Sequence, residues 1–188
     1  MADLARPAAG PVLIAVAGRA STDAKAVEEL FTGCGERLGR FLAQLVDDRA
    51  LAEDLLQDTF YDALRHRDAL ASVRDPEAWL FGIARHRALV SFRSHRRMWR
   101  AIGRLATRGR DQLAPEGTEM VAVRDLLQRH LKPEERSLLV LRYLHGYDAG
   151  ELSAITGLSP EAVRQRLSRA RARLVAASRE GPSRKDRQ

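Results

Sequence analysis

Cysteine and aromatic residues are scarce in this chain, and each scarcity excludes a class of protein. Cys34 is its one cysteine, so the chain can form no internal disulfide and no cysteine-based zinc site, which fits a reducing cytosol. Aromatic residues make up 5% of the 188 residues, whereas alanine, leucine and arginine dominate, and this favours an all-α fold. The apolar run at residues 11–18 is too short to span a bilayer, so we expect a cytoplasmic protein without membrane insertion.

Motifs for catalysis and for cofactor binding are missing as well. The sequence holds no phosphate-binding glycine loop, no metal-ligand cluster and no candidate catalytic triad. Asp54 and Asp58 fall on one helix face and could mimic a metal pair, but nothing nearby completes such a site. We therefore expect a protein that is not an enzyme, with no catalytic residue, no metal and no cofactor.

The charge is unevenly distributed along the chain. The formal net charge is +7 and the sequence pI about 10.4, which favours a polyanionic partner. Residues 47–77 hold nine acidic residues against four arginines, whereas residues 81–110 hold nine arginines and no acid. The second stretch has the composition of a nucleic-acid-binding surface. The first is either a solvated face or a docking surface for a basic protein partner.

A helix-turn-helix is predicted near the C-terminus. Asp148 and Glu151 form a capping box, Gly157 suits the turn, and Ser159 with Pro160 begins a second helix. Apolar residues at helical spacing give the two helices one small core: Leu152, Ile155, Leu158, Val163 and Leu167. The second helix presents polar residues that suit a major groove: Arg164, Gln165, Ser168 and Arg169.

Further helices are predicted upstream, over residues 23–46, 50–67, 76–98 and 131–144. The helix over 50–67 should expose Glu53, Asp54, Gln57, Asp58 and Asp62. The helix over 76–98 begins at Asp75-Pro76 and should bury Trp79, Leu80, Ile83, Leu89 and Val90. The last begins at Pro133, ends before Gly146 and should bury Leu138, Leu139, Leu141 and Leu144. We expect residues 68–75 to form a loop and 1–22 an extension rather than a signal peptide.

Three segments, in this order, resemble the bacterial extracytoplasmic-function (ECF) sigma factors, the smallest members of the sigma-seventy family. They are AEDLLQDTF (52–60), WLFGIARHRALVSFRSHRR (79–97) and LKPEERSLLVLRYLHGYDAGELSAITGLSPEAVRQRLSRARARL (131–174). The resemblance covers residues 25–177 and implies two small helical domains joined by a flexible linker. Region two would span 23–98, the linker 99–119 and region four 120–177, followed by a disordered tail over 178–188.

The resemblance also implies a function and its residues. Such a chain binds core RNA polymerase, at the beta-prime clamp helices and the beta flap, recognises the promoter minus-thirty-five and minus-ten elements and promotes DNA melting. The polymerase-binding residues would be Glu53, Asp54, Gln57 and Asp58. The minus-ten residues would be Arg67, Arg74, Arg85, His86, Arg93, Arg96 and Arg97. The minus-thirty-five residues would be Ser159, Pro160, Glu161, Arg164, Gln165, Ser168, Arg169, Arg171 and Arg173.

Two other functions remain compatible with parts of the sequence. One is a helix-turn-helix transcriptional regulator with an N-terminal helical sensing domain, against which the paired acidic and basic helices argue. The other is an enzyme acting on nucleic acid, which lacks any catalytic constellation here. Many ECF sigma factors are held inactive by an anti-sigma factor that clamps the two domains, so such a protein is a further candidate partner.

Overall fold

The described part of the chain consists of helices joined by short turns and contains no strand. The computed structural model describes residues 11–46, 48–102 and 126–179, with the side chains of 11–22 and 95–102 left aside. The helices are α1 (Pro11–Leu45), α2 (Arg49–Arg65), the 3-10 helix η1 (Arg67–Ser72), α3 (Pro76–Ile102), α5 (Pro133–Tyr143), α6 (Ala149–Thr156) and α7 (Pro160–Arg179). A short helical stretch also covers 126–130. The all-α fold predicted from composition is confirmed.

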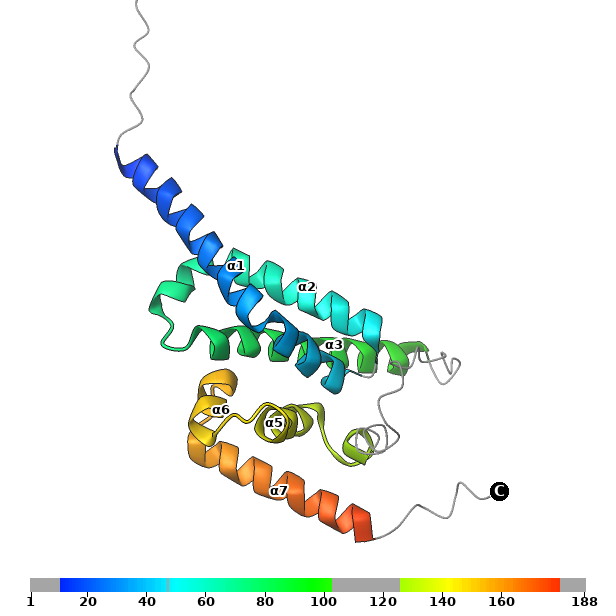
Figure 1. Cartoon of the computed structure of the whole chain (residues 1–188). Coiled ribbons are helices and arrows are strands. Elements are labelled where there is room, and N and C mark those ends of the chain that lie inside the picture. Colours follow the sequence, from blue (N-terminus) through cyan, green and yellow to red (C-terminus); the bar gives the residue numbers. More distant parts are fainter. Residues whose placement is uncertain (1–10, 47, 103–125, 180–188) are drawn as a thin grey trace, which may run out of the picture.

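The first half of the molecule, α1 to α3, is a small bundle with η1 at one end. In Figure 1, α1 crosses α2 and α3, and all three pairs of helices are in contact. Phe41 of α1 and Phe81 of α3 are fully buried, with ring centroids 5.6 Å apart. Burial of one such side chain stabilises the fold by about 1.5–3 kcal/mol. Cys34 is buried in the same bundle, as a small apolar residue would be.

The second half, α5 to α7, contains the helix-turn-helix, and its turn chemistry is as predicted. Asp148 accepts hydrogen bonds from the backbone of Gly150 and Glu151, while the Glu151 carboxylate accepts from the Asp148 backbone. Gly157 ends α6 with φ of 70°, in the left-handed region that glycine adopts without steric cost. Leu152, Ile155, Val163 and Leu167 are buried between the helices, and Leu158 is partly buried.

The two halves pack directly on each other. Figure 1 shows α5 and α6 beneath the α1–α3 bundle, with α7 on the far side. Helix α3 contacts α5 and α6, and α1 contacts α5. The backbones of α3 and α6 come close at Gly82, where an added Cβ would lie 3.1 Å from the carbonyl oxygen of Ile155. One hydrophobic core therefore runs through both halves.

Several predicted boundaries were wrong. Helix α1 begins at Pro11 rather than near residue 23, since proline suits the first turn and the apolar residues that follow are compatible with a helix. Helix α3 continues to Ile102, four residues beyond the predicted end, because no helix breaker occurs before Gly103. The predicted loop contains η1 over 67–72. The rest of the predicted linker, 103–119, and the tail from residue 180 lie outside the described residues.

Two residues predicted to be buried are exposed instead. Val90 is 38% exposed because it directly follows the buried Leu89, and successive side chains of a helix point about 100° apart. Leu144 is 50% exposed because α5 ends at Tyr143 and Leu144 is already the C-cap residue. Trp79 is partly buried against the core, as predicted.

Candidate polymerase and nucleic-acid interfaces

An exposed acidic face runs along α2. Asp48 caps the helix by accepting a hydrogen bond from the backbone nitrogen of Leu51 at 3.0 Å. The buried side of α2 consists of Ala52, Leu55, Thr59 and Ala63, at helical spacing. The opposite side carries the four predicted polymerase-binding residues, all exposed: Glu53, Asp54, Gln57 and Asp58. The structure thus brings these four side chains onto one solvent-facing surface.

Asp62 does not belong to that face, which corrects the sequence-based expectation. Its carboxylate accepts two hydrogen bonds from Arg87 of α3, and the Arg87 Nε to Asp62 Oδ2 distance is 2.5 Å. These hydrogen bonds, opposed by desolvation and helped by the positive charge of Arg87, lower the pKa of Asp62. Asp58 lies farther from the same guanidinium, at 3.9 Å, and stays exposed. Asp62 therefore joins α2 to α3 rather than presenting charge to a partner.

The predicted minus-ten residues are spread over η1, the following turn and α3. Arg67 donates a hydrogen bond to the carbonyl of Leu64 at 3.0 Å, so its guanidinium is tied to the end of α2. Arg74 is exposed in the turn before α3. This turn is fixed by Asp75, which accepts a hydrogen bond from the backbone nitrogen of Ala78 at 2.9 Å and so caps α3 as predicted.

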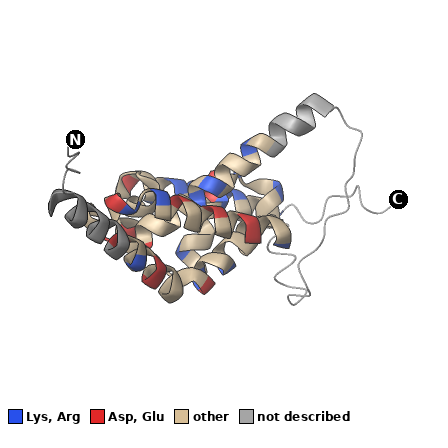
Figure 2. Ribbon diagram, turned by 90° about the horizontal axis from the view of Figure 1, so that it is seen from above, with Lys and Arg blue, Asp and Glu red and all other residues tan. Residues whose placement is uncertain are grey.

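The basic residues of α3 point in different directions. His86 is exposed, whereas Arg85 is partly buried and donates a hydrogen bond from Nε to Ser137 Oγ of α5 at 2.9 Å. Burial lowers the pKa of the Arg85 guanidinium. Arg93 lies 3.8 Å from the Glu134 carboxylate of α5, with both side chains partly exposed. The side chains of Arg96 and Arg97 lie outside the described residues. In Figure 2 the described end of α3 bears basic bands and no acidic ones.

Helix α7 separates a buried side from a polar one. Val163, Leu167 and Ala170 are buried at helical spacing. Ser159 caps the helix by accepting a hydrogen bond from the backbone nitrogen of Ala162 at 3.2 Å. Every predicted minus-thirty-five residue is exposed: Ser159, Pro160, Glu161, Arg164, Gln165, Ser168, Arg169, Arg171 and Arg173. Because α7 is the outermost helix, this polar side is open to solvent (Figure 1).

Glu161 organises the start of α7. Its carboxylate accepts hydrogen bonds from Arg164 at 3.1 Å and from Gln165 at 3.2 Å. The bond from Arg164 is the main cause that lowers the pKa of Glu161. Arg173, at the other end of the face, forms an ion pair with Glu135 of α5. The arrangement holds a guanidinium and an amide side by side, and these two groups are the ones that read guanine and adenine edges.

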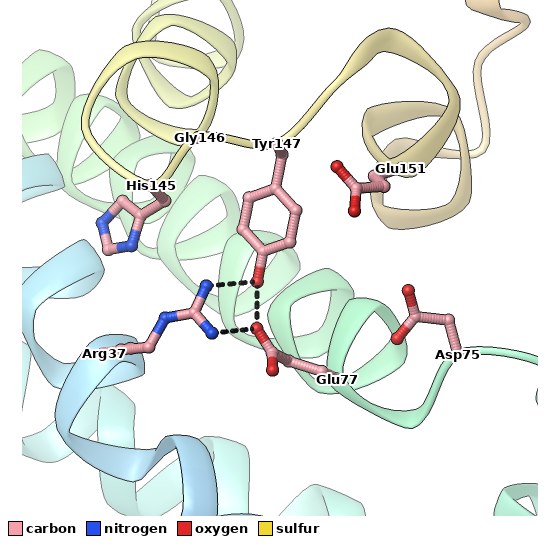
Figure 3. Close-up of a pocket in the computed structure, with 7 residues that line it drawn as sticks. All are labelled: Arg37, Asp75, Glu77, His145, Gly146, Tyr147 and Glu151. Atoms are coloured by element: carbon pink, nitrogen blue, oxygen red, sulfur yellow. Dashed lines mark hydrogen bonds and ion pairs between the residues drawn. The ribbon is translucent and has the colours of Figure 1, made fainter.

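The sequence did not reveal the residues that join the halves. Figure 3 shows Tyr147 pointing from the turn before α6 towards Arg37 of α1 and Glu77 of α3, with His145 beside them. These residues line a pocket of about 270 Å³. A local signal existed for Tyr147, because an apolar residue just before a capping aspartate is often packed. Nothing in the sequence indicated that its partners lie 110 and 70 residues away.

Comparisons with known proteins agree with this geometry. The family model described as "Sigma-70 region 2" matches residues 30–98, and the one described as "Sigma-70, region 4" matches residues 122–174. The chain is 34% identical over 146 residues to the RNA polymerase sigma factor CarQ of Myxococcus xanthus, covering 77% of this chain and 84% of CarQ.

Two solved structures share the fold. One is the sigma factor RpoE in complex with the anti-sigma factor NepR from Bartonella quintana, with a TM-score of 0.67, 22% identity, and coverage of 84% of this chain and 99% of that one. The other is CnrH in complex with the cytosolic domain of CnrY, with a TM-score of 0.63, 26% identity, and coverage of 87% and 96%.

The chain therefore belongs to the sigma-70 family, among its ECF sigma factors. It is an RNA polymerase sigma factor, a transcription initiation subunit and not an enzyme. The alternative of a helix-turn-helix regulator with an N-terminal sensing domain is not favoured. The region-two match covers the N-terminal half, where that hypothesis would place the sensing domain. Among the described residues, no helix is both long and apolar enough to cross a bilayer.

Proposed function

We propose that this sigma factor divides its work among three surfaces: α2 docks on core polymerase, η1 and α3 bind the minus-ten element, and α7 reads the minus-thirty-five element. The exposed polar side of α7 is the observation that carries the proposal. It combines a helix-turn-helix turn, a buried apolar side and a row of arginines with no acid after Glu161. Helices of this kind place their N-terminal residues against base edges in the major groove.

The polymerase-docking surface consists of Glu53, Asp54, Gln57 and Asp58. These four side chains are exposed, whereas Asp62 is paired with Arg87. They form a compact acidic patch, which suits the basic clamp helices of the beta-prime subunit. The second half would also contact the beta flap. Screening weakens exposed charge pairs, so core binding should weaken as salt concentration rises.

The minus-ten surface consists of Arg67, Arg74, Arg85, His86 and Arg93, together with Arg96 and Arg97. These groups suit phosphates and unpaired bases rather than a closed duplex, since guanidinium and imidazole planes stack on exposed bases. On α7, Arg164, Gln165, Ser168 and Arg169 contact bases, with Ser159, Pro160 and Glu161 at the groove entrance. Arg171 and Arg173 contact phosphates and fix the orientation of the helix.

The mechanism depends on simultaneous contacts. Core polymerase holds both halves at a fixed spacing, so the second promoter contact becomes effectively intramolecular. Duplex readout by α7 positions the complex, and the first half then stabilises unpaired bases and traps the melted promoter. The region-two domain would span 23–98 and the region-four domain 120–177, joined by the linker.

An anti-sigma factor is a proposed regulator, acting in the cytoplasm. The related CnrH was solved in complex with the cytosolic domain of CnrY, and the chain covers nearly the whole of CnrH. By analogy, a protein that grips both halves would block the surfaces named above.

Run-off transcription with purified core polymerase on a promoter library tests the proposal. Arg169→Ala should weaken promoter binding and leave core affinity unchanged, whereas Arg40→Ala, an exposed arginine of α1, serves as the matched control. Asp54→Lys should weaken core binding, with Glu29→Lys on α1 as its control. Loss of both activities in either folded variant would contradict the division of roles. Absence of any transcript with the unchanged chain would refute the function itself.

A further inference from the structure

Glu161 is the single acidic residue of α7, a helix that also carries six arginines. It lies in the first turn, and its side chain is exposed. The backbone N–H groups at the N-terminus of a helix favour anions, and a DNA phosphate is such an anion. A carboxylate at this position repels phosphates. The charge of Glu161 therefore opposes the binding of DNA of any sequence.

The carboxylate of Glu161 holds two neighbouring side chains, one with each oxygen. Its Oε2 accepts hydrogen bonds from Arg164, from Nε at 3.3 Å and from Nη2 at 3.1 Å. Its Oε1 accepts a hydrogen bond from Nε2 of Gln165 at 3.2 Å. All three side chains are exposed, so these contacts contribute little to the stability of the fold. Their main effect is on the direction in which Arg164 and Gln165 point.

Glu161 determines which edge of the Arg164 guanidinium faces outwards. The carboxylate engages the edge formed by Nε and Nη2, whereas Nη1 bonds no other residue in the described part of the chain. Each of the two terminal nitrogens of a guanidinium carries two N–H groups, so the terminal edge keeps free donors on both. Such an edge can donate to O6 and N7 of one guanine.

Glu161 also determines the orientation of the Gln165 amide. An ionised carboxylate only accepts hydrogen bonds, so the amide nitrogen must face it and the amide oxygen must face away. The second N–H and the oxygen then remain available together. This is the donor and acceptor pair that N7 and N6 of adenine require. A flipped amide would bring its oxygen against the carboxylate, which is unfavourable.

We propose that Glu161 is a positioning residue that sets the base preference of α7 by orienting Arg164 towards guanine and Gln165 towards adenine, at a cost in general affinity for DNA. This inference rests on the proposed function, in which α7 reads the minus-thirty-five element. Ordering one flexible side chain before binding is worth about two- to tenfold in affinity for the sequence that the side chain fits. Sequences that it does not fit gain nothing, so the gain appears as preference.

The test measures preference and general affinity separately. Preference is measured with core polymerase carrying each sigma variant, on a promoter that the unmodified chain transcribes in the run-off assay. The minus-thirty-five element of this promoter is randomised, and the retained duplexes are sequenced. Arg164→Ala and Gln165→Ala identify the positions that each residue reads. General affinity is measured with the full chain alone on a fluorescein-labelled duplex of mixed sequence.

Glu161→Ala should change the two quantities in opposite directions. Binding of the mixed-sequence duplex should tighten by about two- to fivefold, the size of one exposed charge interaction. The preference at each position read by Arg164 or Gln165 should fall by about two- to tenfold. Glu161→Gln removes the same charge but keeps one acceptor oxygen, which the cationic Arg164 should occupy. It should therefore tighten binding equally, keep the preference at the Arg164 position and lose it at the Gln165 position.

Two control variants show the pattern expected of other roles. Arg171→Ala removes a proposed phosphate contact and should weaken binding of all sequences alike, with the preference unchanged. Glu36→Ala removes an exposed carboxylate of α1 that lies 3.8 Å from Arg40, and it should change neither quantity. Circular dichroism confirms that each variant is folded.

The proposed route through Arg164 is tested by combining substitutions. In an Arg164→Ala background, Glu161→Ala should alter the preference only at the position that Gln165 reads. Full preference at both positions in the single Glu161→Ala variant would overturn the proposal, whatever its general affinity. Weaker binding of the mixed-sequence duplex by this variant would also overturn it, because the carboxylate would then contact DNA favourably itself. If the unmodified chain transcribes no promoter of the library, the proposed function fails and this inference falls with it, whereas transcription with an unaltered preference rejects only the role of Glu161.

Discussion

Acidification should shift the molecule from the closed form, in which its two halves are packed together around His145, to an open form in which they are apart. The ring sits in an apolar site of the closed form, and burial, with the nearby charges of Arg37 and Arg40, lowers its pKa to about 4. The negative charge of Glu77 opposes this effect and raises the pKa of His145. In the open form we expect the ring to be solvated, with an ordinary pKa of about 6.5.

The sign and size follow from proton linkage. Below about pH 6.5 the His145 ring binds a proton in the open form but stays neutral in the closed form. The closed form therefore loses stability relative to the open form as pH falls from about 6.5 towards 4. Between about pH 7.5 and pH 5 these two pKa values change the closed-to-open ratio about thirtyfold, or about 2 kcal/mol. The range stops above the ordinary pKa of carboxylic acids, so that histidine is the group being titrated.

The assay is double electron–electron resonance along a pH series, with spin labels at Thr32→Cys on α1 and Ala176→Cys on α7 in a Cys34→Ala background. Long distances should grow as pH falls, with half of the change complete before pH 5. His145→Gln keeps a neutral hydrogen-bonding side chain beside Gln44 and should abolish most of this pH dependence. A distance distribution that stays constant from about pH 7.5 to 5 would refute the reasoning, as would an identical pH response in the glutamine variant.

Three other predictions concern stability. Gly157→Ala should lower the unfolding free energy by about 1–2 kcal/mol in urea denaturation because of its φ of 70°, whereas Gly33→Ala, in open space on α1, should raise it by up to about 1 kcal/mol. Leu138→Ala should cost about 2–5 kcal/mol because the side chain is fully buried, and Val175→Ala, at a half-exposed residue, less than about 0.5 kcal/mol. Ionised Asp62 stabilises the fold through Arg87, and this contribution is present above the ordinary pKa of Asp62 and is lost as pH falls. Arg87→Met should remove it, so the melting temperature should drop more at neutral pH than in acid.

Local sequence patterns were sufficient to predict much of the helix-turn-helix. The Asp148 capping box, the left-handed Gly157 and the Ser159 cap each depend on residues within a few positions of one another. The exposed faces of α2 and α7 followed from helical periodicity alone, because burial on one side dictates exposure on the other.

Long-range packing explains the failures. Asp62 looked like its acidic neighbours, but it pairs with Arg87 of α3, and no periodicity in α2 indicates that pairing. Val90 was assigned to the core because α3 has apolar residues on more than one side. Which of these sides is buried depends on how α5 and α6 pack on α3. Arg85 received its minus-ten role from the family resemblance, and this role stays a prediction; its hydrogen bond to the Ser137 hydroxyl of α5 is a long-range contact that no local pattern indicates.

The strength of each contact between the halves indicates how the closed form can be displaced. Arg85 donates a hydrogen bond to a neutral hydroxyl. Arg93 lies 3.8 Å from a partly exposed carboxylate, and an ion pair of this kind stabilises by about 0–1 kcal/mol. A phosphate offers either guanidinium a shorter, charge-assisted and bidentate bond. We therefore expect nucleic acid to outcompete α5 for these arginines, and the buried Tyr147 and His145 to be the stronger contacts between the halves. Separation of the halves would then depend mainly on the turn that carries His145 and Tyr147, which lies outside the predicted DNA-binding residues.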